Sequence, residues 1–186
     1  MKHISVNVVS ETVFTVRGHG VHTAYQEHLE ALKKYTSYKV TTNNTQSSDI
    51  VHAHTIGPYS WRKFRQAKYG AVMHAHVTPG SFIGSLRAAK LWAPAAHLYL
   101  RWIYNKADAV ICVSPQVKKE LINLKVKSKL VIIPNMIEVA NFKRPTMSQL
   151  NKLRKQFSVP DDRPCIVASG QVQPRKGAQD FIDMAL

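Results

Sequence analysis

Six short runs of β-branched and apolar residues alternate with segments whose apolar residues recur at helical spacing. The strand-like runs lie at residues 4–9, 38–42, 49–54, 71–76, 108–113 and 130–133, and the helical segments lie at 21–32, 59–67, 86–106 and 116–124. Parallel strands need crossover connections of this kind, and these crossovers are almost always right-handed. The sequence therefore predicts an α/β fold with a doubly wound, mostly parallel, Rossmann-like sheet.

The end of the chain has a strand and helix pattern of its own. A helix is expected at 147–157, a linker at 159–164, a strand at 165–169, a glycine-bounded loop at 170–177 and a helix at 178–186. We interpret residues 1–160 as one domain and residues 161–186 as a linker with the first strand–helix unit of an incomplete second domain, so that the chain is a fragment of a longer protein. In the alternative, the last strand joins the edge of the first sheet.

The composition fits a folded protein of a reducing compartment. Hydrophobic residues make up 45% of the 186 positions, which excludes a disordered chain. No uncharged apolar stretch reaches the ~18 residues of a membrane span, and the first residues lack the pattern of a signal peptide. Cys112 and Cys165 lie far apart in apolar runs, which is typical of free thiols. We therefore expect a cytoplasmic location.

Glycines precede the first helix, close to the end of the first strand. Ligands of doubly wound sheets bind outside the carboxyl ends of the strands. The backbone N–H groups of Gly18, His19 and Gly20, together with the helix N-terminus, could hold a phosphate. A tight turn that needs positive φ is the structural alternative. The three-glycine dinucleotide pattern and its following acid are absent, so a NAD site is not expected.

Two His-x-His pairs lie on neighbouring predicted strands. His52 and His54 form the first pair and His74 and His76 the second, and the two rings of each pair point to one face of a strand. Two such pairs could bind a metal ion, but no carboxylate flanks either pair as a second-shell partner. We therefore expect no metal, with one histidine of each pair packed under a helix. The expected cleft is lined by Gly20, His54, His76 and Ser114.

The positive charge is unevenly placed along the chain. The formal net charge is +15, and no acidic residue occurs between Asp49 and Asp108. Basic surfaces with aromatic residues bind nucleic acid or anionic membranes, but no recognised nucleic-acid motif is present, so no nucleic acid is expected. The segment 61–68 is the predicted membrane contact, through Trp61, Arg62, Lys63, Phe64, Arg65 and Lys68. The alternative is a solvated helix face with core aromatics. Leu98, Trp102 and Ile103 fit a core stripe.

Six motifs in series resemble the family-4 retaining glycosyltransferases of GT-B fold. They are Gly18–Val21, Asp49–His54, Ala71–His76, Ala107–Ser114, Val131–Asn135 and Ser169–Gly177. The resemblance covers the whole chain, with the motifs in the family's order and spacing. It implies a two-domain enzyme that transfers a sugar from a nucleotide-sugar with retention of configuration and without a metal or other cofactor. Residues 1–163 resemble its N-terminal half, which binds the acceptor.

The resemblance also implies roles for individual residues. It places His76 at the reaction centre and Gly18 and Gly20 at the donor diphosphate. It assigns Arg175 and Lys176 to the leaving diphosphate, whose negative charge grows in the transition state. The cleft residues under this interpretation are His54, Ser114 and Asn135. Gln171 departs from the pattern, because many members have arginine there.

A narrower resemblance links the chain to bacterial enzymes that glycosylate diacylglycerol lipids. It lies in residues 18–25, 76–85 and 170–177. We therefore expect glycolipid synthesis by an enzyme on the inner face of the membrane, held there peripherally by anionic lipid. The family's donor-sugar carboxylates would lie beyond residue 186, so the fragment alone is expected to be inactive. The alternatives are a glycosyltransferase with a soluble or anionic sugar acceptor and a non-enzymatic basic α/β module.

Overall fold

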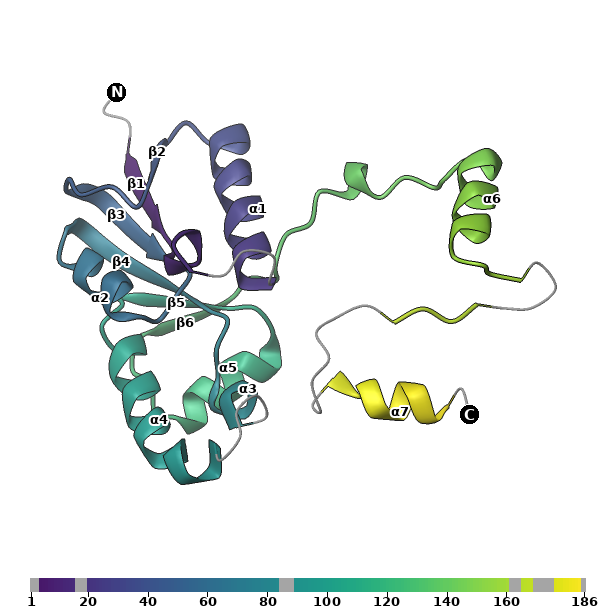
Figure 1. Ribbon diagram of the computed structural model, residues 1–186. Helices are drawn as coiled ribbons and strands as arrows, with labels where there is room; N and C mark the ends of the chain where they lie inside the picture. The colour runs from purple at the N-terminus through teal and green to yellow at the C-terminus, as the bar shows by residue number, and fades with distance from the viewer. Residues whose placement is uncertain (1–3, 16–19, 84–88, 161–164, 169–175, 185–186) are drawn as a thin grey trace. The chain divides into compact units, whose positions relative to one another are not determined.

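The computed structural model describes residues 4–15, 20–83, 89–160, 165–168 and 176–184 (Figure 1). Internal contacts divide the chain into two compact units, Met1–Ile137 and Glu138–Leu186. Each unit is described by itself. A domain boundary is predicted from the sequence at residue 160. The contact division falls earlier, and the assignment of the later residues to a second domain stays a prediction.

The first unit contains a six-stranded sheet in which every neighbouring pair is parallel. The strand order is β2-β1-β3-β4-β5-β6. The strands are β1 Ser5–Val9, β2 Lys39–Thr42, β3 Ser48–Ala53, β4 Ala67–Ala75, β5 Ala109–Cys112 and β6 Lys129–Ile132. This confirms the predicted α/β, Rossmann-like sheet and all six of the strands expected in it.

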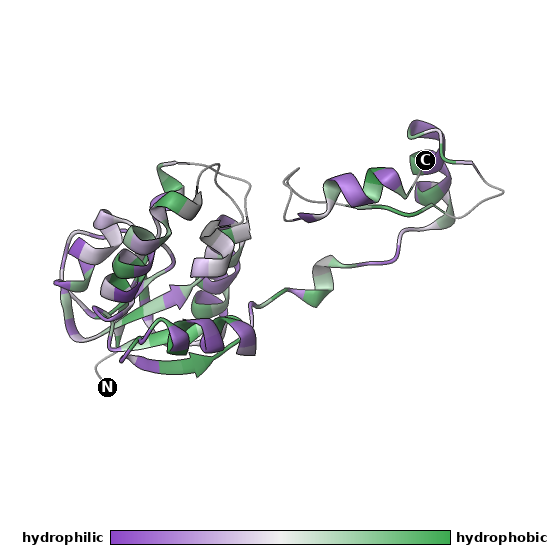
Figure 2. Ribbon diagram, turned by 90° about the horizontal axis from the view of Figure 1, so that it is seen from below, coloured by the Kyte–Doolittle hydropathy of each residue, from purple (hydrophilic) through white to green (hydrophobic). Residues whose placement is uncertain are grey.

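Helices pack on both faces of this sheet, and two separate hydrophobic clusters result. The helices of the first unit are η1 Glu11–Val13, α1 Gly20–Tyr35, α2 Pro58–Phe64, α3 Pro79–Ile83, α4 Ala89–Tyr104 and α5 Pro115–Asn123. Val8 and Tyr25 belong to a small cluster between α1 and the sheet, whereas Val9 belongs to a large cluster with α2, α4 and α5. Adjacent residues of a strand face opposite sides, so Val8 and Val9 reach different clusters. Figure 2 shows the resulting apolar strands in green.

One local prediction for the first unit needs correction. The second helix ends at Phe64 rather than at residue 67, because β4 begins at Ala67 and pairs there with β3. The short helix α3 follows β4 and begins at Pro79. Helix α4 continues through Pro94 without interruption of the helix. A proline near the start of a helix removes only one hydrogen bond to the preceding turn, and the buried face of α4 holds the rest in place.

The second unit consists of short elements without a sheet among its described residues. They are η2 Val139–Asn141, α6 Met147–Gln156 and α7 Ala178–Asp183. Thr146 caps α6 by accepting a hydrogen bond from the Gln149 N–H, which explains the predicted helix start. The strand predicted at 165–169 is absent from residues 165–168, where Ile166 and Val167 are exposed. No strand of the described chain pairs with this segment, and a strand needs such a partner.

None of the helices in the described ranges is long and apolar enough to cross a bilayer.

Candidate functional site

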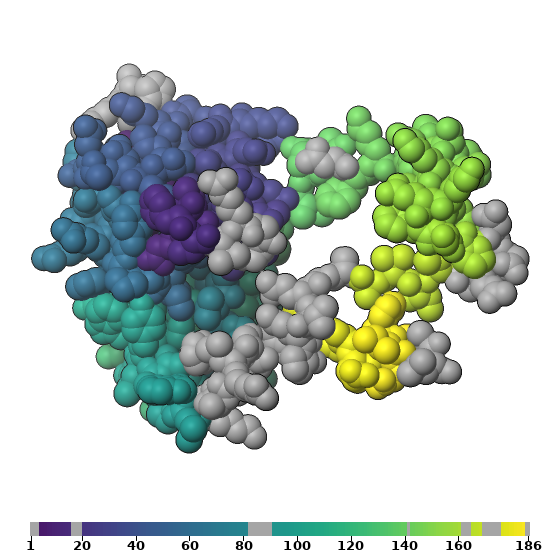
Figure 3. Space-filling model, viewed as in Figure 1, coloured from purple at the N-terminus to yellow at the C-terminus, as the bar shows by residue number. Residues whose placement is uncertain are grey.

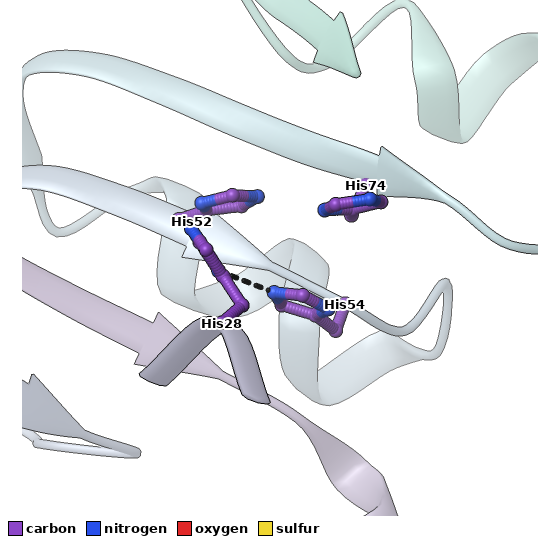
Figure 4. Close-up of side chains that lie close together, drawn as sticks. All are labelled: His28, His52, His54 and His74. Carbon is purple, nitrogen blue, oxygen red and sulfur yellow. Dashed lines mark hydrogen bonds between the residues drawn. The ribbon is translucent and has the colours of Figure 1, made fainter. Parts of the chain in front are cut away.

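Five histidines meet where β3 and β4 end beneath α1. His28 comes from α1, while His52 and His54 come from β3 and the residue after it. His74 lies in β4 and His76 follows that strand. The rings of His54 and His74 are 4.7 Å apart, and those of His74 and His76 are 4.5 Å apart and nearly parallel. Figure 4 shows the side chain of His28 reaching from its helix to His52 and His54, with His74 on the neighbouring strand.

Sheet register explains why the two sequence pairs form one cluster. His52 lies beside Val72 in the ladder, so the second pair continues on the same face toward the carboxyl ends of the strands. Both pairs are visible as sequence motifs, whereas His28 was not predicted. Helical spacing could have indicated the position of His28, because it lies three residues after the buried Tyr25 on the face of α1 that covers the sheet.

Hydrogen bonds join three of the rings in a row. The Nδ1 atom of His28 lies 2.9 Å from Nε2 of His54. The Nδ1 atom of His54 lies 3.2 Å from Nε2 of His76. His54 is 1% exposed and connects the helix to the residue at the end of β4. The rings of His52 and His74 pack against this row.

Burial keeps four of these five histidines uncharged near neutral pH. Loss of hydration lowers the pKa of His28, lowers those of His52 and His54 well below their usual range, and lowers that of His74 to about 3. Neighbouring imidazoles lower the last three pKa values further. Among the described residues, Nε2 of His52 and both ring nitrogens of His74 are buried without a hydrogen-bond partner.

The donor set could in principle coordinate a transition metal. Ring nitrogens of His28, His52, His54 and His74 all lie within 4.8 Å of one another. Imidazole suits zinc, copper and nickel, but all four ligands are neutral and this group contains no carboxylate. A buried dication would therefore keep its full charge in a poorly hydrated site. The expected absence of a metal stays a prediction.

A pocket of about 260 Å³ opens beside the histidines, between α1 and the ends of β5 and β6. Leu32 and Tyr35 of α1 line one side, and Ile111 and Ile133 line the other. His28 and His74 line it from the cluster, and Thr36 and Asn135 are among the other lining residues. Of the residues predicted for the acceptor cleft, His54 and His76 are therefore in direct contact, and Asn135 lines the pocket beside them.

The other predicted site residues lie at the starts of α1 and α5, in the second unit, or outside the described residues. Gly20 begins α1 and is exposed, and among the described residues outside its own helix turn no atom lies within 4 Å of where its side-chain carbon would stand. Ser114 caps α5, because its hydroxyl oxygen accepts the Val117 N–H. Lys176 is exposed in the second unit. Gly18 and Arg175 lie outside the described residues.

The predicted membrane segment does not form a single amphipathic face. Phe64 is buried in the large cluster, and Lys63 is buried with its Nζ donating to the Asn44 carbonyl at 2.7 Å. Burial lowers the pKa of Lys63, and the neighbouring Arg62 lowers it further. Lys68 belongs to β4 and does not share a helix with Trp61. Residues 61–68 therefore do not form one exposed helical face, and membrane contact through them stays a prediction.

Helix α4 exposes the apolar face that the 61–68 segment lacks. Ile103 is buried as expected, but Leu98 is 69% exposed and Trp102 is 40% exposed, so neither completes a core stripe. We call the exposed apolar side of this helix the α4 face. It consists of Leu91, Trp92, Leu98, Tyr99 and Trp102. The exposed Arg101 and Lys106 flank it, and α4 is coloured teal on the surface in Figure 3.

Comparison with known proteins agrees with this architecture. The family model "Glycosyltransferase Family 4" matches residues 31–141, which is more than half of the chain. Over 99% of its length, the chain is 28% identical to an alpha-galactosylglucosyldiacylglycerol synthase of Streptococcus pneumoniae and covers 50% of that protein. Over 98% of its length, it is 26% identical to a processive diacylglycerol alpha-glucosyltransferase of Acholeplasma laidlawii and covers 54% of it.

A third relative is an alpha-monoglucosyldiacylglycerol synthase of Streptococcus pneumoniae. The identity is 26% over 84% of this chain and 35% of the relative. The chain spans about half the length of the first two curated relatives, and less of this one. The parallel sheet, its histidine-lined edge and the family match over residues 31–141 agree, and the chain belongs to glycosyltransferase family 4.

Proposed function

We propose that residues 1–186 form the acceptor-binding part of a glycosyltransferase that glycosylates a diacylglycerol lipid. The observation that carries this proposal is the likeness of nearly the whole chain to two proteins named for diacylglycerol glycosylation. The donor is a nucleotide-sugar and the sugar is transferred with retention of configuration, without a metal cofactor. The remaining donor contacts belong to a second half, for which the relatives' length leaves room.

The edge of the sheet supplies chemistry that suits this reaction. Gly20 is exposed at the start of the 16-residue helix α1, where N–H groups and the helix dipole favour a phosphate. His76 stands after β4 and carries a polar ring at the edge where doubly wound sheets bind ligands. We assign His76 to the reaction centre and Gly20, with Gly18, to the donor diphosphate. From the family resemblance we also assign Arg175 and Lys176 to the leaving diphosphate.

The pocket beside the histidines is proposed as part of the acceptor site. Its walls are mostly aliphatic and aromatic, and its polar lining side chains include His28, Thr36 and Asn135. An acceptor with an apolar body and a hydroxyl-bearing head fits this division, because apolar walls bind its body while a few polar groups orient it. Diacylglycerol lipids have this character.

We further infer that the enzyme acts peripherally on the inner face of an anionic membrane. The α4 face combines exposed tryptophan, tyrosine and leucine side chains with the flanking Arg101 and Lys106. Aromatic residues anchor proteins at the bilayer interface, and each nearby basic residue adds about 1 kcal/mol at an anionic leaflet. The charge of +15 acts in the same direction.

The test is an assay of the complete polypeptide that contains this chain, with a labelled nucleotide-sugar and diacylglycerol in mixed vesicles. We expect a glycolipid product that keeps the donor's anomeric configuration, and no product from residues 1–186 alone. His76→Ala should lower kcat far more than it raises KM, because the contact forms chiefly in the transition state. His97→Ala, in an exposed histidine of α4, is the control. Transfer only to soluble sugars would overturn the lipid assignment and favour the soluble-acceptor alternative.

A further inference from the structure

The row of His28, His54 and His76 has a property that the family match does not assign. Both nitrogens of His54 are engaged, Nε2 with His28 and Nδ1 with His76. Both bonds join a Nδ1 atom to a Nε2 atom. A neutral imidazole carries a single N–H, so it donates through one nitrogen and accepts through the other. His54 therefore cannot donate to both neighbours or accept from both.

We propose that His54 is a positioning residue that fixes the tautomer of His76, and that His28, His54 and His76 carry their protons on the same ring nitrogen. If His54 holds its proton on Nδ1, it donates to Nε2 of His76, which leaves the His76 proton on Nδ1. Its own Nε2 then accepts from Nδ1–H of His28. If His54 holds its proton on Nε2, both bonds reverse and all three protons lie on Nε2.

The surroundings of the row favour such strict coupling. His54 is 1% exposed, so water has little access to compete for its nitrogens. The rings of His52 and His74 stack on it at 4.9 Å and 4.7 Å, which hinders rotation of the ring. Burial lowers the pKa of His54 and of His28, so both rings stay neutral at the pH where the bonds must alternate. Loss of either bond would leave a buried nitrogen without a partner, which is costly.

This coupling decides what His76 presents to a ligand. A His76 ring protonated on Nδ1 donates a hydrogen bond from Nδ1, whereas a ring protonated on Nε2 accepts a hydrogen bond at Nδ1. The reaction-centre role of His76 rests on the proposed function, and a hydrogen-bond donor and an acceptor serve different substrate atoms. The network from α1 therefore controls the chemistry at the strand end without touching the substrate.

The coupling is measured directly by long-range ¹H–¹⁵N spectra of the 186-residue chain with labelled histidine at pH 8. We expect His28, His54 and His76 to show one shared tautomer. The exposed His97 should show the mixture of a solvated ring and serves as the internal reference. Different single tautomers within the row, or a solvent-like mixture at His76, would overturn the proposal without any variant being made.

Two variants of His54 separate its two bonds. The amide of asparagine can replace Nδ1, and the longer glutamine can replace Nε2. In His54→Asn the bond to His76 should survive, so His76 keeps a single tautomer. In His54→Gln that bond should be lost, and His76 should change to the mixture seen at His97. An unchanged His76 spectrum in a folded His54→Gln chain would show that His54 does not set the tautomer.

The complete transferase provides a second measurement that depends on the proposed function. His54→Gln should lower kcat about tenfold relative to His54→Asn, with KM for the donor nearly unchanged, because one hydrogen bond to the positioned ring is lost. Equal kcat values for the two variants would contradict the positioning role. Shared tautomers in a protein without transferase activity would instead uphold the coupling and overturn the proposed function.

Discussion

The indole ring of Trp61 in α2 lies 5.3 Å from the indole ring of Trp102 in α4. Trp61 also packs against the large hydrophobic cluster, and Tyr99 lies 5.8 Å from Trp102. The residue predicted to insert into a bilayer from α2 is thus partly covered by α4. The apolar side chains that this region can offer to a membrane are therefore those of the α4 face.

Replacing Leu91 and Leu98 by glutamate should abolish binding to anionic vesicles. Both side chains are exposed, at 80% and 69%, so the change should leave folding intact while it places charge in the contact. We expect flotation with vesicles to fall at least about tenfold and binding of the unchanged chain to weaken as salt is added.

The matched control is Tyr69→Glu with Ile122→Glu. These residues lie on β4 and α5, are 76% and 56% exposed, and give the same change in net charge. Flotation should fall only modestly in the control. Equal loss in both double variants would show that overall charge, rather than the α4 face, attracts the membrane. Charge reversal at Lys63 is unsuitable as a test, because it would bury a carboxylate against the Asn44 carbonyl.

Asp49→Ala should lower the free energy of unfolding by about 2–3 kcal/mol. The buried carboxylate of Asp49 accepts hydrogen bonds from the backbone N–H and the hydroxyl of Ser5, both at 2.8 Å, and thereby joins β3 to β1. Its loss leaves donors of Ser5 without a partner. Urea denaturation measures the change, and Glu30→Ala on the exposed side of α1 should shift stability by no more than about 0.5 kcal/mol. A similar small shift for Asp49→Ala would contradict this account.

Purified chain should contain no stoichiometric transition metal. The four clustered histidines offer only neutral ligands, so a buried dication would lack compensating charge. Elemental analysis after expression in zinc-supplemented medium, followed by dialysis, provides the measurement. One zinc per chain that disappears in His52→Gln but remains in His97→Gln would show instead that the cluster is a metal centre.

The sequence predicted the sheet well because periodicity and turn chemistry are local properties. All six strands of the sheet and the meeting of His54 with His76 follow from alternation and parallel register. The failures concern which side of a helix is covered. Phe64 and Lys63 are buried, and Leu98 is exposed, because other elements cover or leave those faces. The spacing within a single helix contains no information about its neighbours.

His28 illustrates the same limit at the candidate site. The two His-x-His pairs are visible as motifs, but His28 joins them only through the packing of α1 on the sheet. Likewise, Asn135 lines the pocket because the chain after β6 passes α1, a tertiary relationship. Motifs therefore located the strand ends, whereas the hydrogen-bonded row and the pocket required the fold.

Acidification should unfold the first unit well before its carboxylates are fully protonated. Burial lowers the pKa values of His28, His52, His54 and His74, the last to about 3, whereas unfolded histidines titrate near pH 6.5. Between these limits the unfolded chain binds protons that the folded chain does not, so the free energy of unfolding falls as the pH falls. The slope approaches about 1.4 kcal/mol per pH unit for each such histidine.

Urea denaturation between pH 8 and pH 5 should therefore show full stability at the upper end and a steep decline below about pH 6.5. His74→Leu should flatten the decline by about one proton, because the unfolded chain then has one fewer histidine to protonate. The substitution should be tolerated, since the two ring nitrogens of His74 have no hydrogen-bond partner to lose. His97→Leu in exposed α4 should leave the slope unchanged. A stability that is constant from pH 8 to pH 5 would show that the histidine cluster takes up protons without unfolding.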